Sequence, residues 1–193
     1  MDVRDLLQRA STHPRDSAER TLYIVAAVDV ALGRSFTLIG GSAVHFYTGE
    51  YRPTDVDLAG RAGTEERRLL GDKGFVFLGP GHRHVELRLG GDVHLIEFPT
   101  SGYDIEAVLE VRLENDLKVR VISLSDLIVD RLIQATDGTL LIFEDAVSLV
   151  VAMYPEIEWL TLEERIDREA VTLPGIADML VRVRAAAAKA MRS

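Results

Sequence analysis

The feature that most constrains the fold of this 193-residue chain is a short apolar segment, residues 36–39, that runs directly into Gly40-Gly41-Ser42. Glycine has no side chain, so at such a position backbone N–H groups can approach an anionic phosphate closely. The pattern predicts a strand over residues 36–39, a phosphate-binding turn at Gly40, Gly41 and Ser42, and a helix over residues 42–47.

Two carboxylates follow soon after, in the sequence Asp55-Val56-Asp57. If residues 54–58 form a strand, positions two apart point to the same face and lie about 6.6 Å apart along it. Carboxylate oxygens are the ligands that Mg²⁺ takes where the ion bridges a protein and substrate phosphates. Asp55 and Asp57 are therefore predicted to bind one metal ion, or two ions about 3.5 to 4 Å apart that assist displacement at phosphorus.

The order of these motifs across residues 38–58 resembles the signature of the DNA-polymerase-beta-like nucleotidyltransferases. It is most similar to minimal prokaryotic members, the abortive-infection and toxin-type enzymes. In these, Gly-Gly-Ser, a helix of small residues, Arg-x-Ser/Thr and Asp-x-Asp occur in this order. The resemblance implies an enzyme that uses an NTP and Mg²⁺ or Mn²⁺ and releases pyrophosphate. It also implies that Arg52 and Thr54, next to the first aspartate, contribute to nucleotide binding.

A third carboxylate is expected from a later strand, because the family that the chain resembles commonly places one beside its Asp-x-Asp strand. Glu97 follows the apolar-rich stretch 93–96 and fits this position. It is predicted to complete the metal site or to deprotonate the attacking hydroxyl. An exposed acid at a strand end is the alternative interpretation. Glu86 and Asp92 are weaker candidates, since Asp92 lies in a predicted Gly-Gly-Asp turn.

The remaining pattern predicts an α/β (α+β) fold, in which a nucleotidyltransferase-type mixed sheet flanked by helices is followed by a C-terminal helical bundle. The first half is predicted to hold helices over residues 17–33 and 64–70 and strands over residues 75–78, 83–89, 93–98 and 118–122. The second half is predicted to hold helices over residues 123–133, 140–153, 162–171 and 176–190. No flexible linker separates the halves, so a core at residues 1–122 and a helical region at 123–193 are expected to pack together.

Two residues of the helical half fit further elements of the toxin-type relatives. These enzymes typically carry a basic residue, usually Lys, on one helix and an acid on the next, both near the site. Arg131 and Asp145 take those positions, so the resemblance implies that Arg131 binds phosphate and Asp145 orients it or the nucleotide. Arg keeps the charge of Lys but presents a planar fork of donors. A salt bridge between the two helices is the alternative interpretation.

Composition limits the partners. The formal net charge is −9, with −2 in residues 1–100 and −7 in the remainder, which disfavours broad affinity for a nucleic acid backbone. There is no cysteine, no apolar run long enough for a membrane span and no signal-peptide pattern at the start, so a cytoplasmic protein without membrane partners is expected. The acceptor is left open between an RNA end, a protein hydroxyl and a small molecule, and a cognate antitoxin is a possible partner.

Two other classes of function are open. The first is a nucleotidyltransferase-like fold that no longer catalyses and serves as a binding or scaffolding protein, although Ser42, Asp55 and Asp57 are all intact. The second is a phosphatase or sugar transferase built on Asp-x-Asp. A haloacid-dehalogenase-type phosphatase would carry an apolar strand directly before that motif, where this chain has Tyr-Arg-Pro-Thr, and it would give the upstream glycines no role.

Overall fold

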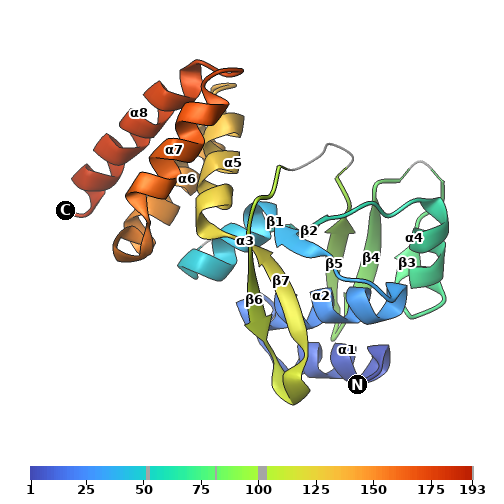
Figure 1. The fold of residues 1–193 in the computed structure, drawn as a ribbon. Helices are drawn as coiled ribbons and strands as arrows, with labels where there is room; N and C mark the ends of the chain where they lie inside the picture. Colours follow the sequence, from blue (N-terminus) through green and yellow to red (C-terminus); the bar gives the residue numbers. More distant parts are fainter. Residues whose placement is uncertain (51–52, 81, 100–103, 193) are drawn as a thin grey trace. The chain divides into compact units, whose positions relative to one another are not determined.

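The computed structural model describes residues 1–50, 53–80, 82–99 and 104–192. The chain divides into two compact units, Met1–Ile122 and Ser123–Ser193. The first unit holds a mixed sheet with helices, and the second is helical (Figure 1). The predicted fold class, a mixed α/β core followed by helices, is confirmed. Among the described residues, no helix combines the length and hydrophobicity needed to cross a membrane.

The sheet of the first unit has seven strands among the described residues, in the order β3-β4-β5-β2-β1-β7-β6. The pairs β1–β7 and β2–β5 are parallel and the other neighbouring pairs are antiparallel. The strands are β1 (Thr37–Ile39), β2 (Asp55–Ala59), β3 (Val76–Phe77), β4 (His84–Leu89), β5 (Asp92–Glu97), β6 (Val108–Arg112) and β7 (Lys118–Ile122). The central strands β5, β2 and β1 therefore come from three separate parts of the sequence.

Four helices belong to the first unit: α1 (Val3–Thr12), α2 (Ala18–Leu32), α3 (Gly40–Thr48) and α4 (Thr64–Gly71). α2 is the central one, because its residues from Arg20 to Asp29 are buried and it contacts β2, β7 and the other three helices. Ser17 caps its start by accepting a hydrogen bond from the Arg20 N–H, and Gly33 ends it in the left-handed conformation. Both ends agree with the sequence prediction.

Arg20 fastens α2 to the β4–β5 hairpin. Its guanidinium is almost completely buried, donates a 2.7 Å hydrogen bond to the carbonyl of Leu89 and lies 3.0 Å from the Asp92 carboxylate. Asp92 is thus engaged at the turn end of the hairpin, at the opposite end of β5 from Glu97.

The second unit consists of α5 (Leu124–Ala135), α6 (Leu140–Ala152), α7 (Trp159–Glu169) and α8 (Gly175–Ala190), which lie side by side (Figure 1). Short 3₁₀ turns, Glu114–Asp116 in the first unit and Tyr154–Glu156 in the second, complete the described elements. Ser123 caps α5 through a hydrogen bond from the Asp126 N–H. All four helices carry buried apolar residues that form the core of this unit.

Several predicted boundaries were wrong, and two elements were missed. Gly40 to Ser42 form the first turn of α3 rather than a turn ahead of it, since the helix follows Ile39 directly. Gly40, at the start of this turn, takes a positive φ of 64°. α1 was not predicted, although Asp2 and Asp5 form a capping box at its start. β6 was not predicted because most of its residues are exposed and lack an alternating pattern.

Asp29 is a buried acid near the end of α2. One of its oxygens accepts a 2.8 Å hydrogen bond from the Phe36 N–H, while the other has no partner among the described residues. Burial raises the pKa of Asp29 to about 7, although the Phe36 N–H and Arg120 both favour the charged form. The folded state therefore binds a proton that the unfolded state has released, so this residue lowers stability as the pH rises from about 4 to about 7.

Asp29→Asn is expected to stabilise the protein at about pH 8, because the amide oxygen still accepts from the Phe36 N–H and no buried charge remains. A tenfold difference in proton affinity between the folded and unfolded states corresponds to about 1.4 kcal/mol. Removing a penalty of even about 1.4 kcal/mol should raise the Tm by about 3 to 6 °C in a chain of this size. Thermal unfolding of Asp29→Asn and of the unmodified protein at several pH values measures this difference in Tm. The gain should shrink towards about pH 4, and a constant gain at all pH values would contradict the assignment.

Candidate active site

Three carboxylates meet on one face of the sheet. Ligand oxygens of Asp55, Asp57 and Glu97 all lie within 4.8 Å of one another, and all three residues are partly exposed. Among the described residues, this is the group of His, Asp and Glu side chains with the spacing of a metal site. The arrangement places three hard oxygen ligands around one point and leaves one side open to solvent.

The register of the sheet creates this cluster. Side chains alternate along β2, so Asp55 and Asp57 share the partly exposed face while Val56 and Leu58 are buried on the other. β5 runs parallel to β2, and Glu97 pairs directly with Asp57. Directly paired residues point to the same face, which brings a carboxylate from a distant part of the sequence beside the Asp-x-Asp pair.

Gly40 brings α3 against the carboxylates. A side-chain Cβ at Gly40 would lie 2.8 Å from Asp57 Cγ and would overlap with its Oδ2. The residue also has a left-handed φ, which glycine adopts without strain. Only glycine therefore allows the first turn of α3, with its free backbone N–H groups, to reach this close to the cluster.

Ser42 and Thr54 both contact Asp55. The Ser42 hydroxyl is buried and donates a 2.6 Å hydrogen bond to the backbone carbonyl of Asp55. The Thr54 hydroxyl donates to Asp55 Oδ1 at 3.3 Å. Ser42 therefore joins α3 to β2, a positioning contact that the sequence did not predict, while phosphate binding by Ser42 and Thr54 stays a prediction.

Arg83 and His84 lie on the far side of Glu97 from Asp57. Arg83 Nε is 3.6 Å from Glu97 Oε1, and His84 on β4 pairs directly with Glu97. The contact between Arg83 and Glu97 was not predicted from the sequence. The alternative third carboxylate, Glu86, lies further along β4 and forms an ion pair with Arg88 at 3.5 Å.

The other predicted nucleotide-binding residues are not among the described residues of the first unit. Arg52 lies outside the described residues. Arg131 and Asp145 belong to the second unit, where both are buried and their side chains are 3.7 Å apart. Arg131 also forms a 2.6 Å ion pair with Asp130. Burial raises the pKa of Asp145, and Arg131 works against that shift. The predicted interhelix salt bridge is present, and the nucleotide role of the pair stays a prediction.

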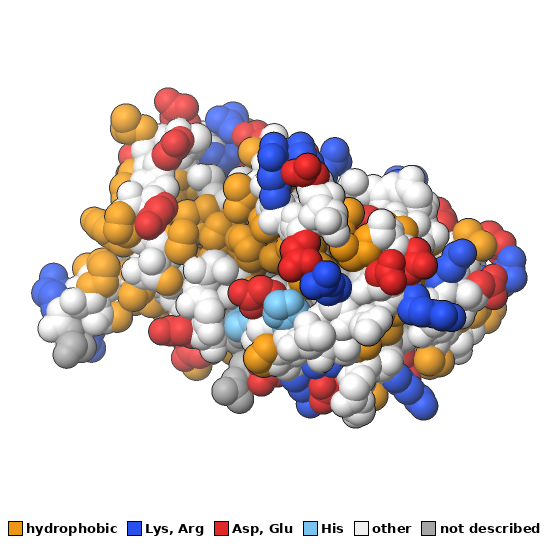
Figure 2. Space-filling view, turned by 90° about the horizontal axis from the view of Figure 1, so that it is seen from below, with side chains coloured by type: hydrophobic (Ala, Val, Ile, Leu, Met, Phe, Trp, Pro, Cys, Tyr) orange, Lys and Arg blue, Asp and Glu red, His pale blue; other side chains and the backbone are white. Residues whose placement is uncertain are grey.

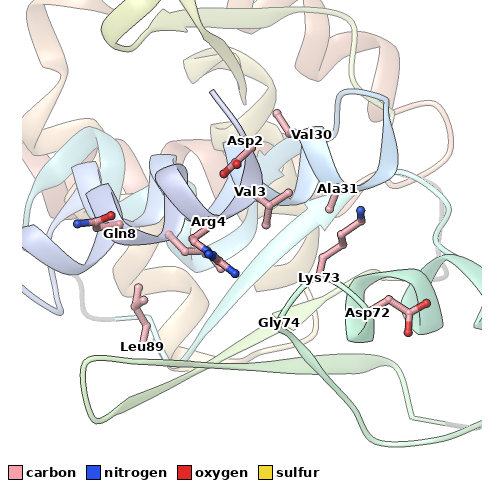
Figure 3. Close-up of a pocket in the computed structure, with 11 residues that line it drawn as sticks. Asp2, Val3, Arg4, Gln8, Val30, Ala31, Asp72, Lys73, Gly74 and Leu89 are labelled. Carbon is pink, nitrogen blue, oxygen red and sulfur yellow. The ribbon is translucent and has the colours of Figure 1, made fainter.

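A cavity of about 780 Å³ lies in another part of the first unit, between α1, the end of α2 and the turn after α4 (Figure 3). Apolar residues such as Val3, Val30 and Leu89 line it together with Arg4 and Lys73. None of the three clustered carboxylates contributes to its wall. The size of this cavity therefore does not indicate catalysis within it. The carboxylate cluster is the candidate active site.

The cluster fits a divalent cation such as Mg²⁺ or Mn²⁺. Both ions prefer carboxylate oxygens, and Mg²⁺ in phosphate-handling sites takes one or two carboxylates and completes its shell with water and phosphate oxygens. The partly exposed Asp55, Asp57 and Glu97 offer such ligands and leave positions for substrate. Without a cation, three carboxylates this close repel one another, so the charge of the cluster itself favours metal binding.

No protein-family model matches the chain, and no curated protein matches it in sequence. Among solved structures, it is similar to an antigenic nucleotidyltransferase-like protein from Paracoccidioides brasiliensis. The TM-score is 0.55 at 16% identity, and the match covers 90% of this chain and 92% of that one. A second match is the antibiotic-resistance factor ANT(2'')-Ia, with a TM-score of 0.46, 15% identity, and coverage of 90% and 97%. The first match shows that the fold is nucleotidyltransferase-like, and the second is too distant to support any argument.

Proposed function

We propose that this protein is a metal-dependent nucleotidyltransferase that transfers NMP from an NTP to an acceptor and releases pyrophosphate. The observation that carries the proposal is the cluster of Asp55, Asp57 and Glu97 directly beside the first turn of α3. Carboxylates for a metal and free backbone N–H groups for phosphate lie next to each other, as transfer from an NTP requires. The nucleotidyltransferase-like fold supports the same activity.

The reaction is a displacement at the α-phosphorus of the NTP. The acceptor oxygen forms a bond to this phosphorus, the bond to the bridging oxygen breaks, and pyrophosphate leaves with the electron pair. A bound Mg²⁺ or Mn²⁺ would neutralise charge on the phosphates. Gly40 and Gly41 present backbone N–H groups to the β- and γ-phosphates. The Ser42 hydroxyl holds Asp55 in place by its hydrogen bond to the backbone carbonyl of Asp55. Glu97 accepts the proton that the acceptor hydroxyl releases in this proposal.

The proposal is tested by incubating the purified protein with each α-labelled NTP, Mg²⁺ or Mn²⁺, and separate pools of RNA, protein and small molecules. Label should appear in one acceptor pool with release of pyrophosphate, and EDTA should abolish it. Calorimetry should show nucleotide binding that requires the metal. If the protein binds neither NTP nor metal, the non-catalytic scaffold predicted as the alternative is correct. The predicted toxin role stays a prediction, which a small antitoxin reading frame beside the gene would support.

A further inference from the structure

The positions of α3 and β4 indicate on which side of the carboxylate cluster each of the two substrates binds. α3 contacts Asp57 through Gly40, on the side of the cluster that faces β1. β4 adjoins Glu97 on the opposite side. In a displacement at phosphorus the attacking and leaving oxygens are roughly in line. If pyrophosphate leaves at the first turn of α3, the acceptor must approach from the β4 side.

The residues on the β4 side are rich in hydrogen-bond donors. His84 is directly opposite Glu97 in an antiparallel pair, where Cβ atoms are about 4.5 to 5.5 Å apart. The Arg83 guanidinium reaches Glu97 at 3.6 Å, and its side chain is 67% exposed. The ring centroids of His82 and His84 are 6.1 Å apart. Neither imidazole makes a side-chain hydrogen bond within the described parts of the chain.

The hydrogen-bond donors on the β4 side are of the kind that bind an oxyanion such as phosphate. Arg83 supplies a fixed positive charge and a planar set of N–H donors, which match phosphate oxygens, and a neutral imidazole adds a further N–H donor. A polycationic acceptor would instead be repelled by Arg83. Glu86, the carboxylate on β4, forms its ion pair with Arg88 at 3.5 Å.

We propose that the acceptor carries a phosphate group close to its reacting hydroxyl and that Arg83, His82 and His84 bind this phosphate. The inference rests on the proposed function, because it places the acceptor relative to the metal site. Two sources share the chemistry: the 3′ end of an RNA and a small phosphorylated molecule. The formal net charge of −9 disfavours broad affinity for a nucleic acid backbone, so the recognition that we propose is local. Figure 2 shows acidic and basic side chains interspersed on the face of the molecule that is seen from below.

The test compares four acceptor probes with α-labelled NTP and Mn²⁺: ribose 5-phosphate, ribose, a short oligoribonucleotide with a free 3′-hydroxyl, and a polycationic aminoglycoside. We expect transfer to a phosphate-bearing probe to exceed transfer to ribose and to the aminoglycoside by about tenfold or more. Ribose 5-phosphate and the oligoribonucleotide then distinguish the two sources of the phosphate.

Arg83→Gln should raise the KM for the favoured probe about 10- to 100-fold and leave the KM for NTP unchanged, since charged hydrogen bonds have this effect. Arg88→Gln is the matched control, because Arg88 lies on β4, which Arg83 directly precedes, is 72% exposed and pairs with a carboxylate outside the cluster. It should change neither KM. Thermal unfolding of both variants checks that they fold.

Three results would overturn the inference while the protein still binds NTP with metal: label on the aminoglycoside in preference to the phosphates, no label on either phosphate-bearing probe, or equal effects of Arg83→Gln and Arg88→Gln. Absence of metal-dependent NTP binding in the unmodified protein would overturn the proposed function, and this inference with it.

Discussion

Asp57→Asn is expected to lower nucleotidyl transfer by about 10²- to 10³-fold, the size of effect seen when one group that stabilises transition-state charge is removed. Asp57 is the central member of the cluster, since it pairs with Glu97 across the strands, shares a face with Asp55 and is contacted by Gly40. Asparagine keeps the shape of the side chain but removes one of the negative charges that bind the cation.

Metal binding gives a second measure of the same variant. A ligand that binds only the folded state raises its stability, so Mn²⁺ should raise the Tm of the unmodified protein, and this rise should be lost in Asp57→Asn. Glu86→Gln is the matched control, because Glu86 lies on the same sheet but pairs with Arg88 outside the cluster. Unchanged transfer by Asp57→Asn, or an equal loss in Glu86→Gln, would contradict the assignment of the metal site.

Gly40→Ala is expected to disrupt the site without touching a chemical group in it. Gly40 and Gly49 lie at the two ends of α3 with nearly equal φ values of 64° and 70°. Alanine at either position costs about 1 to 2 kcal/mol in backbone strain. Only at Gly40 does the added Cβ also collide with Asp57, whereas nothing lies within 4 Å of a Cβ at Gly49.

Gly49→Ala therefore serves as the control for the strain alone. Gly40→Ala should lose about 1 kcal/mol or more of stability beyond the control, as expected of an overpacked position, and should also lose metal-dependent transfer. Denaturant unfolding and the labelled-NTP assay measure the two effects. If both alanine variants behave alike, the approach of α3 to Asp57 has no role in the site.

The parts of the site that depend on local pattern were predictable from the sequence. The shared face of Asp55 and Asp57 follows from the two-residue period of a strand. The ends of α2 follow from a serine cap and a left-handed glycine, both of which are local signals. The position of Gly40 inside α3 was not predictable, because glycine usually ends helices and no local pattern reports that Gly40 lies against Asp57.

The parts that depend on sheet order were harder to predict. Glu97 was selected through a family resemblance, but its pairing with Asp57 is set by a parallel register between strands forty positions apart in the sequence. The pairing of His84 with Glu97 depends in turn on that register. No local periodicity reports which strands become neighbours, so Arg83 and His84 could be recognised beside the cluster only in the folded chain.

The β4–β5 hairpin is attached to α2 at its turn end, and this determines which part of the site is lost first when the protein begins to unfold. Arg20 fastens the turn end of this hairpin through Leu89 and Asp92, whereas Glu97 lies at the other end. Strand ends open more readily than buried centres. Local fraying at Glu97 would remove one of the three carboxylates while Asp55 and Asp57 stay in place on β2. Mild heating or denaturant should therefore inactivate the protein before its global unfolding, with hydrogen exchange rising first at the end of β5.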